Sequence, residues 1–345
     1  MRTALIILLA FAAGVLVMQW LPKQALAVPG MTAARTPAAV GPVASGTASA
    51  EADAEDDADA ASAPGWPESA PSPEQVLYAQ PKRVADALAG LTPRVAGKPN
   101  LYVVAFAGDG GEDVFRNEVE YAAQLFPQRF GPTAHALVLE NSPDTLGTRP
   151  LASWSNLEAA LDGVSKVMKP DQDILLLYMT SHGDEDHNLL VDMDPLPLDQ
   201  IGAADLAGIL AKRPFKWKVL VVSACYSGGF VPPLHGAGTL VLTAARADRS
   251  SFGCGSDSDA TYFGKAWLVD ALNQTPDFIA AFHQASAEIA QWEKRDKLTA
   301  SEPQIDVGAG IADQLEQWRK GFTPGPAVPF APAVPATASS AADAP

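Results

Sequence analysis

Two residues that can do covalent chemistry stand at the ends of apolar runs. The run WKVLVVSA (217–224) is followed directly by Cys225, and the run DILLLYMT (173–180) is followed by Ser181 and His182. A thiolate is a strong nucleophile, and an imidazole at hydrogen-bonding distance can take the thiol proton and later protonate a leaving amine. The pair therefore indicates nucleophilic catalysis, provided that the fold brings Cys225 and His182 together.

Glycines accompany both residues. Gly183 follows His182, and Gly228 and Gly229 follow Cys225 closely. A substrate can approach glycine backbone closely, and the N–H groups of Gly183 and Cys225 can point at a developing oxyanion. A single buried cysteine is usually a small hydrophobic residue, but the shared position of Cys225 and His182 favours a catalytic role.

Strands and helices alternate around these residues. Compact apolar runs predict strands at 101–107, 135–140, 173–180, 217–224 and 238–245. Helical spacing predicts helices at 111–126, 153–168, 198–212, 260–273 and 276–294. The alternation predicts an α/β sandwich with a mostly parallel sheet. Because sites in such sheets form beyond the carboxyl ends of the strands, Cys225 and His182 are expected at one edge.

A serine nucleophile is an alternative to the cysteine. The turn around Ser227 is similar to a nucleophile elbow, but Cys225 stands where that motif has glycine. The motif also places its histidine later in the chain, and neither His235 nor His283 follows a strand end.

Two further arrangements of these side chains compete with catalysis. Four residues of the polar loop could form a metal site, although ligands packed so closely are more typical of a solvated loop: His182, Asp184, Asp186 and His187. A disulfide between Cys225 and Cys254 would consume the thiol.

Composition limits the class of partner. The 345 residues include 24 basic and 40 acidic side chains, a net charge of −16, and 48% are hydrophobic. An acidic chain without a basic face is not expected to bind nucleic acid. No cofactor is expected.

The first segment has the pattern of a secretory signal. Arg2 precedes an apolar run over residues 4–17, and Ala25-Leu26-Ala27 forms a small-x-small cleavage site. Residues 1–27 therefore predict a signal peptide and an exported protein, either periplasmic or secreted. The alternative is an uncleaved membrane anchor over residues 4–21.

Low-complexity sequence flanks a single predicted domain. Residues 28–80 are rich in alanine, proline and acids, which predicts a disordered linker. Residues 81–322 are expected to form the folded domain, and the proline- and alanine-rich residues 323–345 a disordered tail.

Four blocks of this sequence resemble peptidase family C13, the legumain-type cysteine peptidases of the caspase-like clan. They are FAGDGGEDVFRNEVEYAAQLF (106–126), TSHGDEDHNLLV (180–191), SACYSGGF (223–230) and LTAARADRSSFGCGSDSDATYFGKAW (242–267). The resemblance covers about residues 99–275 and implies a caspase-like three-layer sandwich with about six strands. It also implies a cysteine endopeptidase that acts on a protein or peptide substrate through a Cys-His dyad and a covalent acyl-enzyme.

The resemblance carries roles onto individual residues. It implies Cys225 as the nucleophile, His182 as general base and then acid, and the amides of Gly183 and Cys225 as the oxyanion hole. It implies that Arg116 lies in the pocket for P1, the substrate residue before the cleaved bond. Ser250 and Ser251 would line the substrate cleft.

Three positions depart from the family pattern. The family's histidine-orienting asparagine is Val114 here, which predicts a dyad without a third member. At two positions where the family has acids, this chain has Tyr226 and Lys265. The loss of these acids predicts that Asp or Glu is preferred over Asn at P1. The alternative is that Arg116 and Lys265 pair with nearby acids such as Asp257, Asp259 or Glu112. A non-catalytic peptide-binding module and a transpeptidase or ligase are the competing functions.

Overall fold

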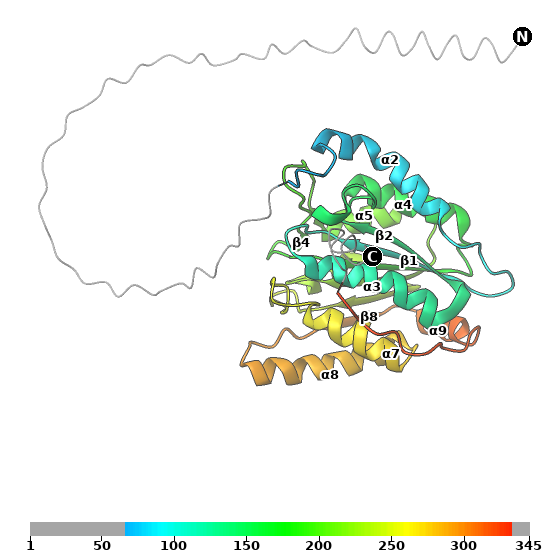
Figure 1. Ribbon diagram of the computed structural model, residues 1–345. Coiled ribbons are helices and arrows are strands. Elements are labelled where there is room, and N and C mark those ends of the chain that lie inside the picture. Colours follow the sequence, from blue (N-terminus) through cyan, green and yellow to red (C-terminus); the bar gives the residue numbers. More distant parts are fainter. Residues whose placement is uncertain (1–65, 333–345) are drawn as a thin grey trace, which may run out of the picture. The chain divides into compact units, whose positions relative to one another are not determined.

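The centre of the molecule is a six-stranded sheet. A computed structural model describes residues 66–332 (Figure 1). The strand order is β2-β1-β3-β6-β7-β8, and only β8 runs antiparallel to its neighbour. The strands are β1 (Leu101–Ala107), β2 (Ala134–Glu140), β3 (Ile174–Thr180), β6 (Trp217–Ser223), β7 (Thr239–Thr243) and β8 (Gln304–Val307). The predicted mostly parallel sheet of about six strands is confirmed.

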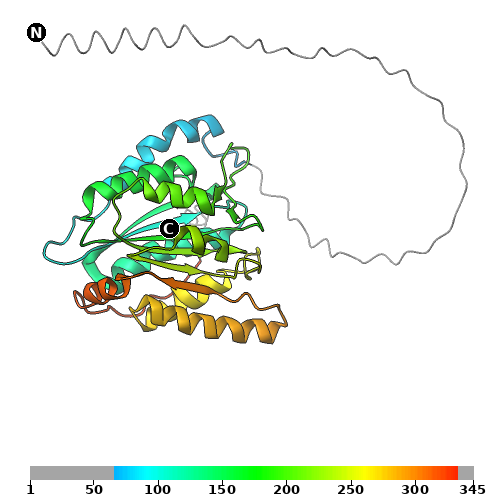
Figure 2. The ribbon, with the colours of Figure 1, turned by 180° about the vertical axis from the view of Figure 1, so that it is seen from behind.

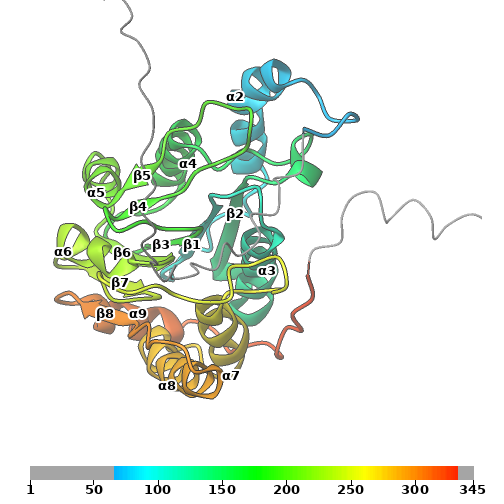
Figure 3. The same ribbon diagram turned by 90° about the vertical axis from the view of Figure 1, so that its left-hand side faces the viewer.

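Helices cover both faces of the sheet, so the molecule has three layers (Figure 3). One face carries α3 (Asp113–Phe130), the π-helix Gly264–Ala271, α7 (Leu272–Gln274), α8 (Phe278–Asp296) and α9 (Ile311–Arg319). The other, seen from behind in Figure 2, carries α2 (Pro73–Ala89), α4 (Trp154–Val167), α5 (Ala203–Ala211) and α6 (Val231–Leu234). Alternate residues of β1 enter the two cores: Val103 faces the first and Val104 the second. Burial on both faces explains why the strands read as continuous apolar runs.

The described chain extends beyond the predicted domain limits at both ends. Helix α2 starts at Pro73, inside the predicted linker 28–80, and its residue Val76 is fully buried. In the predicted tail, Val328 is buried and its carbonyl accepts a hydrogen bond from Tyr121 Oη at 2.8 Å. The domain limits of 81 and 322 are therefore too narrow for the ordered structure.

The remaining terminal predictions fall on other residues. The predicted signal peptide 1–27, the alternative anchor 4–21 and most of the linker lie outside the described residues. Between residues 66 and 332, no helix combines the length and the apolar character needed to span a membrane.

A pair of short antiparallel strands, β4 (Asn188–Leu189) and β5 (Ile201–Gly202), follows β3.

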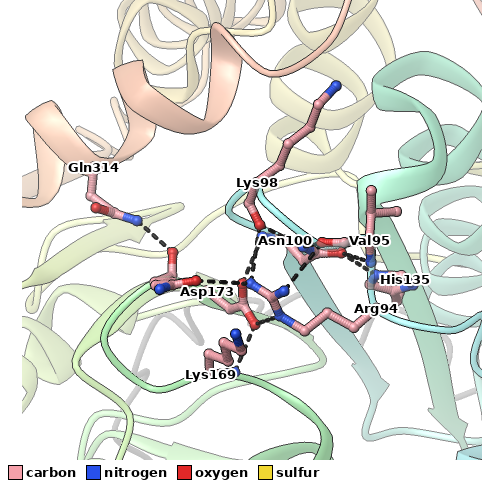
Figure 4. Close-up of polar contacts among 9 residues, drawn as sticks. Arg94, Val95, Lys98, Asn100, His135, Lys169, Asp173 and Gln314 are labelled. Carbon is pink, nitrogen blue, oxygen red and sulfur yellow. Dashed lines mark hydrogen bonds and ion pairs between the residues drawn. The ribbon is translucent and has the colours of Figure 1, made fainter.

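A polar network holds the amino ends of β1 and β3 (Figure 4). The carboxylate of Asp173 is fully buried and pairs with Arg94, whose Nε lies 2.7 Å from Oδ2. The backbone N–H groups of Asn100 and Lys169 donate to the same carboxylate at 2.9 and 2.7 Å. Since four donors satisfy this carboxylate, it can stay charged inside the fold.

Candidate active site

Neighbouring strands bring Cys225 and His182 to the same edge of the sheet. Thr180 of β3 pairs with Ser223 of β6, so the two residues lie at equal distances beyond paired strand ends. A Cβ atom on Gly183 would overlap the carbonyl oxygen of Cys225. The His182 and Cys225 segments are therefore in backbone contact, and only glycine allows this approach at position 183.

The sulfur of Cys225 is surrounded by the polar atoms of Ser251. The Ser251 N–H donates to Sγ at 3.3 Å, and the Ser251 carbonyl and hydroxyl oxygens each lie 3.6 Å from it. Ser251, predicted to line the substrate cleft, thus lies against Cys225, and its neighbour Ser250 lines the adjoining groove.

The second cysteine is a free thiol with a different environment. Neither Cys225 nor Cys254 is in a disulfide. Burial, and after it the neighbouring Cys225, raises the pKa of Cys254 to about 11. Cys254 is therefore almost entirely protonated at neutral pH and a poor nucleophile there.

The imidazole of His182 is held on two sides. Its Nε2 lies 3.5 Å from Oδ2 of Asp109, a buried carboxylate whose Oδ1 accepts the Gly111 N–H at 2.9 Å. The ring of Phe115 packs edge-on against the imidazole with 5.2 Å between centroids. The His182 side chain stays 38% exposed, which leaves access for a substrate. The sequence reasoning did not anticipate Asp109.

Glycines after Cys225 let two other loops pack against its turn. A Cβ on Gly228 would overlap the backbone N of Ala247, and a Cβ on Gly229 would overlap the ring of His187. His187 Nδ1 lies 3.1 Å from the carbonyl oxygen of Tyr226, another contact absent from the sequence prediction. These contacts fix the turn that carries Cys225.

Tyr226 adopts a backbone conformation unusual for its type. Its φ is 56°, in the left-handed region, and its N–H donates to the Arg249 carbonyl at 2.7 Å. Such a conformation costs free energy and persists where its surroundings enforce it. Its hydroxyl lies 3.4 Å from Glu185, so the side chain turns toward the His182 loop.

The two backbone amides predicted to form an oxyanion hole donate no hydrogen bond within the described part of the fold. Within residues 66–332, neither the Gly183 N–H nor the Cys225 N–H has a hydrogen-bond acceptor. Both groups sit beside the sulfur-bearing turn and can donate to a substrate oxygen.

The two cations predicted for the P1 pocket are engaged by acids. Arg116 is buried and pairs with Asp144 and with Asp113, the latter at 3.3 Å. Lys265 pairs with Asp270. These ion pairs favour the alternative in which the cations are neutralised within the fold, although by other acids than Glu112, Asp257 and Asp259.

A buried carboxylate, that of Glu118, contacts both Thr261 and Gly264. Glu118 on α3 is fully buried, and burial raises its pKa. Tyr178 Oη and the Thr261 N–H donate to it at 2.7 and 2.8 Å, and a Cβ on Gly264 would overlap it. The Thr261 hydroxyl in turn lies 3.1 Å from that of Ser223. This network supports the end of β6 two residues before Cys225.

A groove of about 600 Å³ lies beside the turn that carries Cys225. Tyr226 and Ser250, the neighbours of Cys225 and Ser251, form part of its wall. Phe252 and Leu298 add apolar surface, and the groove also contains charged side chains: Asp248, Arg249 and Lys297. Its place and its mixed lining suit an extended peptide.

The alternative chemistries find less support in the structure. Ser227 is fully buried, and its Oγ accepts the Ala245 N–H at 3.1 Å, so it is not exposed as a nucleophile. Of the His, Cys, Asp and Glu side chains in residues 66–332, no group of three or more could hold a metal ion.

A thiol and an imidazole at the carboxyl edge of a parallel sheet, beside free amide donors, define a cysteine peptidase-like protein. The family model described as the peptidase C13 family matches residues 155–313, which include both His182 and Cys225. The match confirms the predicted resemblance to this family. Asp109 and Arg116 precede the matched segment.

Similar solved structures include two caspases. One is a crystal structure of caspase-1 from Spodoptera frugiperda, 12% identical, with a TM-score of 0.44; the likeness covers 64% of this chain and 90% of that chain. The other is a structure of pro-sf-caspase-1, 11% identical, with a TM-score of 0.43, 63% of this chain and 91% of that chain. No curated protein matches the sequence.

Proposed function

We propose that this protein is a cysteine endopeptidase that cleaves peptide bonds through Cys225 and His182. The observation that carries the proposal is the backbone contact of Gly183 with Cys225, because it joins the segments of a nucleophile and a base. The match to the peptidase C13 family supports it. Export is proposed as well, on the signal-peptide pattern of residues 1–27 alone.

In the proposed reaction, His182 accepts the thiol proton and the sulfur attacks the carbonyl carbon of the substrate. The N–H groups of Gly183 and Cys225 hold the oxyanion of the tetrahedral intermediate. His182 then protonates the leaving amine, and the C–N bond breaks to give an acyl-enzyme. His182 deprotonates a water molecule, which attacks the thioester carbonyl; the C–S bond breaks, the carboxylic acid product leaves, and His182 returns the proton to the sulfur.

The groove beside Tyr226 is the proposed binding site for the substrate chain. Its position next to Cys225 would let an extended peptide place a carbonyl at the sulfur. Phe252 and Leu298 supply apolar surface, and the exposed side chain of Lys297 supplies positive charge. The proposed substrate is therefore an exposed segment of a protein or a peptide.

A diverse peptide mixture tests this function. Cleavage products are identified by mass spectrometry for the wild type and for the variants Cys225→Ala, His182→Ala and both together. Each single substitution is expected to lower kcat/KM by about 100-fold or more, and the double variant little further, because the two residues act as a unit. Cys254→Ala, a matched change of the protonated thiol, is expected to leave cleavage intact.

Thiol labelling separates the mechanism from the choice of substrate. Iodoacetamide is expected to modify Cys225 faster than Cys254 at neutral pH, because the pKa of Cys254 is raised to about 11. Faster labelling of Cys254, or full activity of Cys225→Ala, would contradict the mechanism. Binding of peptides without cleavage would instead support the non-catalytic module, and joined peptides would indicate a transpeptidase.

A further inference from the structure

Three adjacent parallel strands end at the same level and deliver three polar residues. Ala107 of β1 pairs with Thr180 of β3, which pairs with Ser223 of β6. Two residues beyond these partners stand Asp109, His182 and Cys225. The histidine strand lies between the other two, so its imidazole has the carboxylate on one side and the thiol strand on the other.

Asp109 is held in place by contacts of its own. The side chain is 8% exposed, and Oδ1 accepts the Gly111 N–H at 2.9 Å, which leaves Oδ2 toward His182 Nε2 at 3.5 Å. Its backbone forms a bridge with Asp192, where the Gly110 N–H donates to the Asp192 carbonyl at 3.0 Å. The carboxylate is thus directed at the imidazole by a rigid loop.

We propose that Asp109 is the positioning residue of a Cys225–His182–Asp109 triad. The inference rests on the proposed peptidase function and adds a third member where the departure at Val114 predicted a dyad. With Nε2 toward Asp109, Nδ1 is the ring nitrogen that serves the thiol. The carboxylate fixes the ring orientation and stabilises the imidazolium that forms when His182 takes the proton.

Other acids surround this pair, and they define the controls. Burial, and after it Asp109, raises the pKa of Glu112, while the nearby His182 lowers it. Burial and Asp109 also raise the pKa of Asp192, which interacts with Asp109 and Asp194. Glu112 is therefore the competing partner for the imidazole, and Asp192 is a nearby carboxylate without that contact.

The test compares Asp109→Asn, Glu112→Gln and Asp192→Asn with the wild type. Each substitution removes one charge and keeps the side-chain shape. The rate of iodoacetamide reaction with Cys225 is measured from pH 5 to 9, with thermal unfolding as a check on folding. Asp109→Asn is expected to confine fast labelling to alkaline pH and to lower kcat by about 100-fold with a small change in KM.

The two control variants are expected to keep the wild-type labelling profile. A wild-type profile in Asp109→Asn, or the same shift in Glu112→Gln alone, would overturn the assignment. Should Asp109→Asn fail to fold, Asp109→Ser, which is smaller and also neutral, is measured in its place against the same outcomes. Labelling requires no substrate, so a protein that labels as expected but cleaves no peptide refutes the peptidase proposal and not the triad.

Discussion

Gly183 is the residue at which the His182 and Cys225 segments touch. A Cβ there would overlap the carbonyl oxygen of Cys225 and come within 3.2 Å of the Ala224 Cβ, so backbone has to move. Gly183→Ala is therefore expected to displace the nucleophile and lower kcat/KM by about 10-fold or more, because small errors in catalytic geometry cost rate. Steady-state cleavage of a peptide substrate measures the effect.

The matched control is Gly208→Ala on the exposed face of α5. A Cβ at Gly208 meets nothing within 4 Å, and alanine favours helix, so this variant should gain about 0.5–1 kcal/mol in free energy of unfolding without loss of activity. Equal activity of Gly183→Ala and Gly208→Ala would show that close contact at Gly183 is not needed.

Cys225 and His182 could be predicted because each follows a long apolar strand and precedes glycine. The same rule applied to LYVVAFA would have found Asp109, two residues beyond β1. Gly108 and Asp109 instead have the pattern of a glycine-rich turn, which carries no catalytic signal. The contact with His182 also depends on β1 lying beside β3, an adjacency that sequence order alone does not determine.

At the scale of elements, the runs that became β1, β3 and β6 were predictable because burial on both faces makes them continuously apolar. Strand β8, Gln304–Val307, is short, polar and partly exposed at the sheet edge, so it carried no such signal. Helix α2 was missed because Pro73, Pro81 and its alanines resemble the linker before it, although Ser72 caps it with a capping box.

The network at the amino ends of β1 and β3 yields a prediction about stability. Asp173→Ala removes a fully buried carboxylate and leaves the Arg94 guanidinium without its ion-pair partner. The free energy of unfolding is expected to fall by about 3–5 kcal/mol, as for other buried ion pairs that lose one partner. Chemical denaturation measures this loss, and kcat/KM of the folded protein should not change because the site lies at the opposite ends of these strands.

The control for Asp173→Ala is a surface ion pair. Lys82 and Asp86 have side chains that are 80% and 63% exposed, so Lys82→Ala should cost about 0.5 kcal/mol or less. Similar losses for the two variants would mean that the Arg94–Asp173 pair adds little to stability.

For the whole molecule, two buried groups give the unfolding free energy opposite dependences on pH. Burial lowers the pKa of His135 from 6.5, so its contribution is complete above that pH and is lost as the pH falls from there through the lower pKa of the folded state. Glu140, at the end of β2, acts in the other direction. It is 1% exposed, and burial outweighs the nearby Thr145 side chain, which acts on its pKa in the opposite direction.

Burial, and after it the neighbouring Glu120, raises the pKa of Glu140 from 4.5 to about 7. The folded state therefore holds this proton more tightly than the unfolded chain. Its contribution to stability is complete below pH 4.5 and is lost as the pH rises to about 7, a change on the order of 3 kcal/mol.

Glu140→Gln keeps the neutral shape at every pH and should remove this dependence. Denaturation of both proteins between pH 5 and 8 should show that the free energy of unfolding of the variant increases relative to that of the wild type as the pH rises. The exposed Glu74→Gln serves as the control and should run parallel to the wild type. Parallel curves for Glu140→Gln would mean that Glu140 is already ionised in the folded protein.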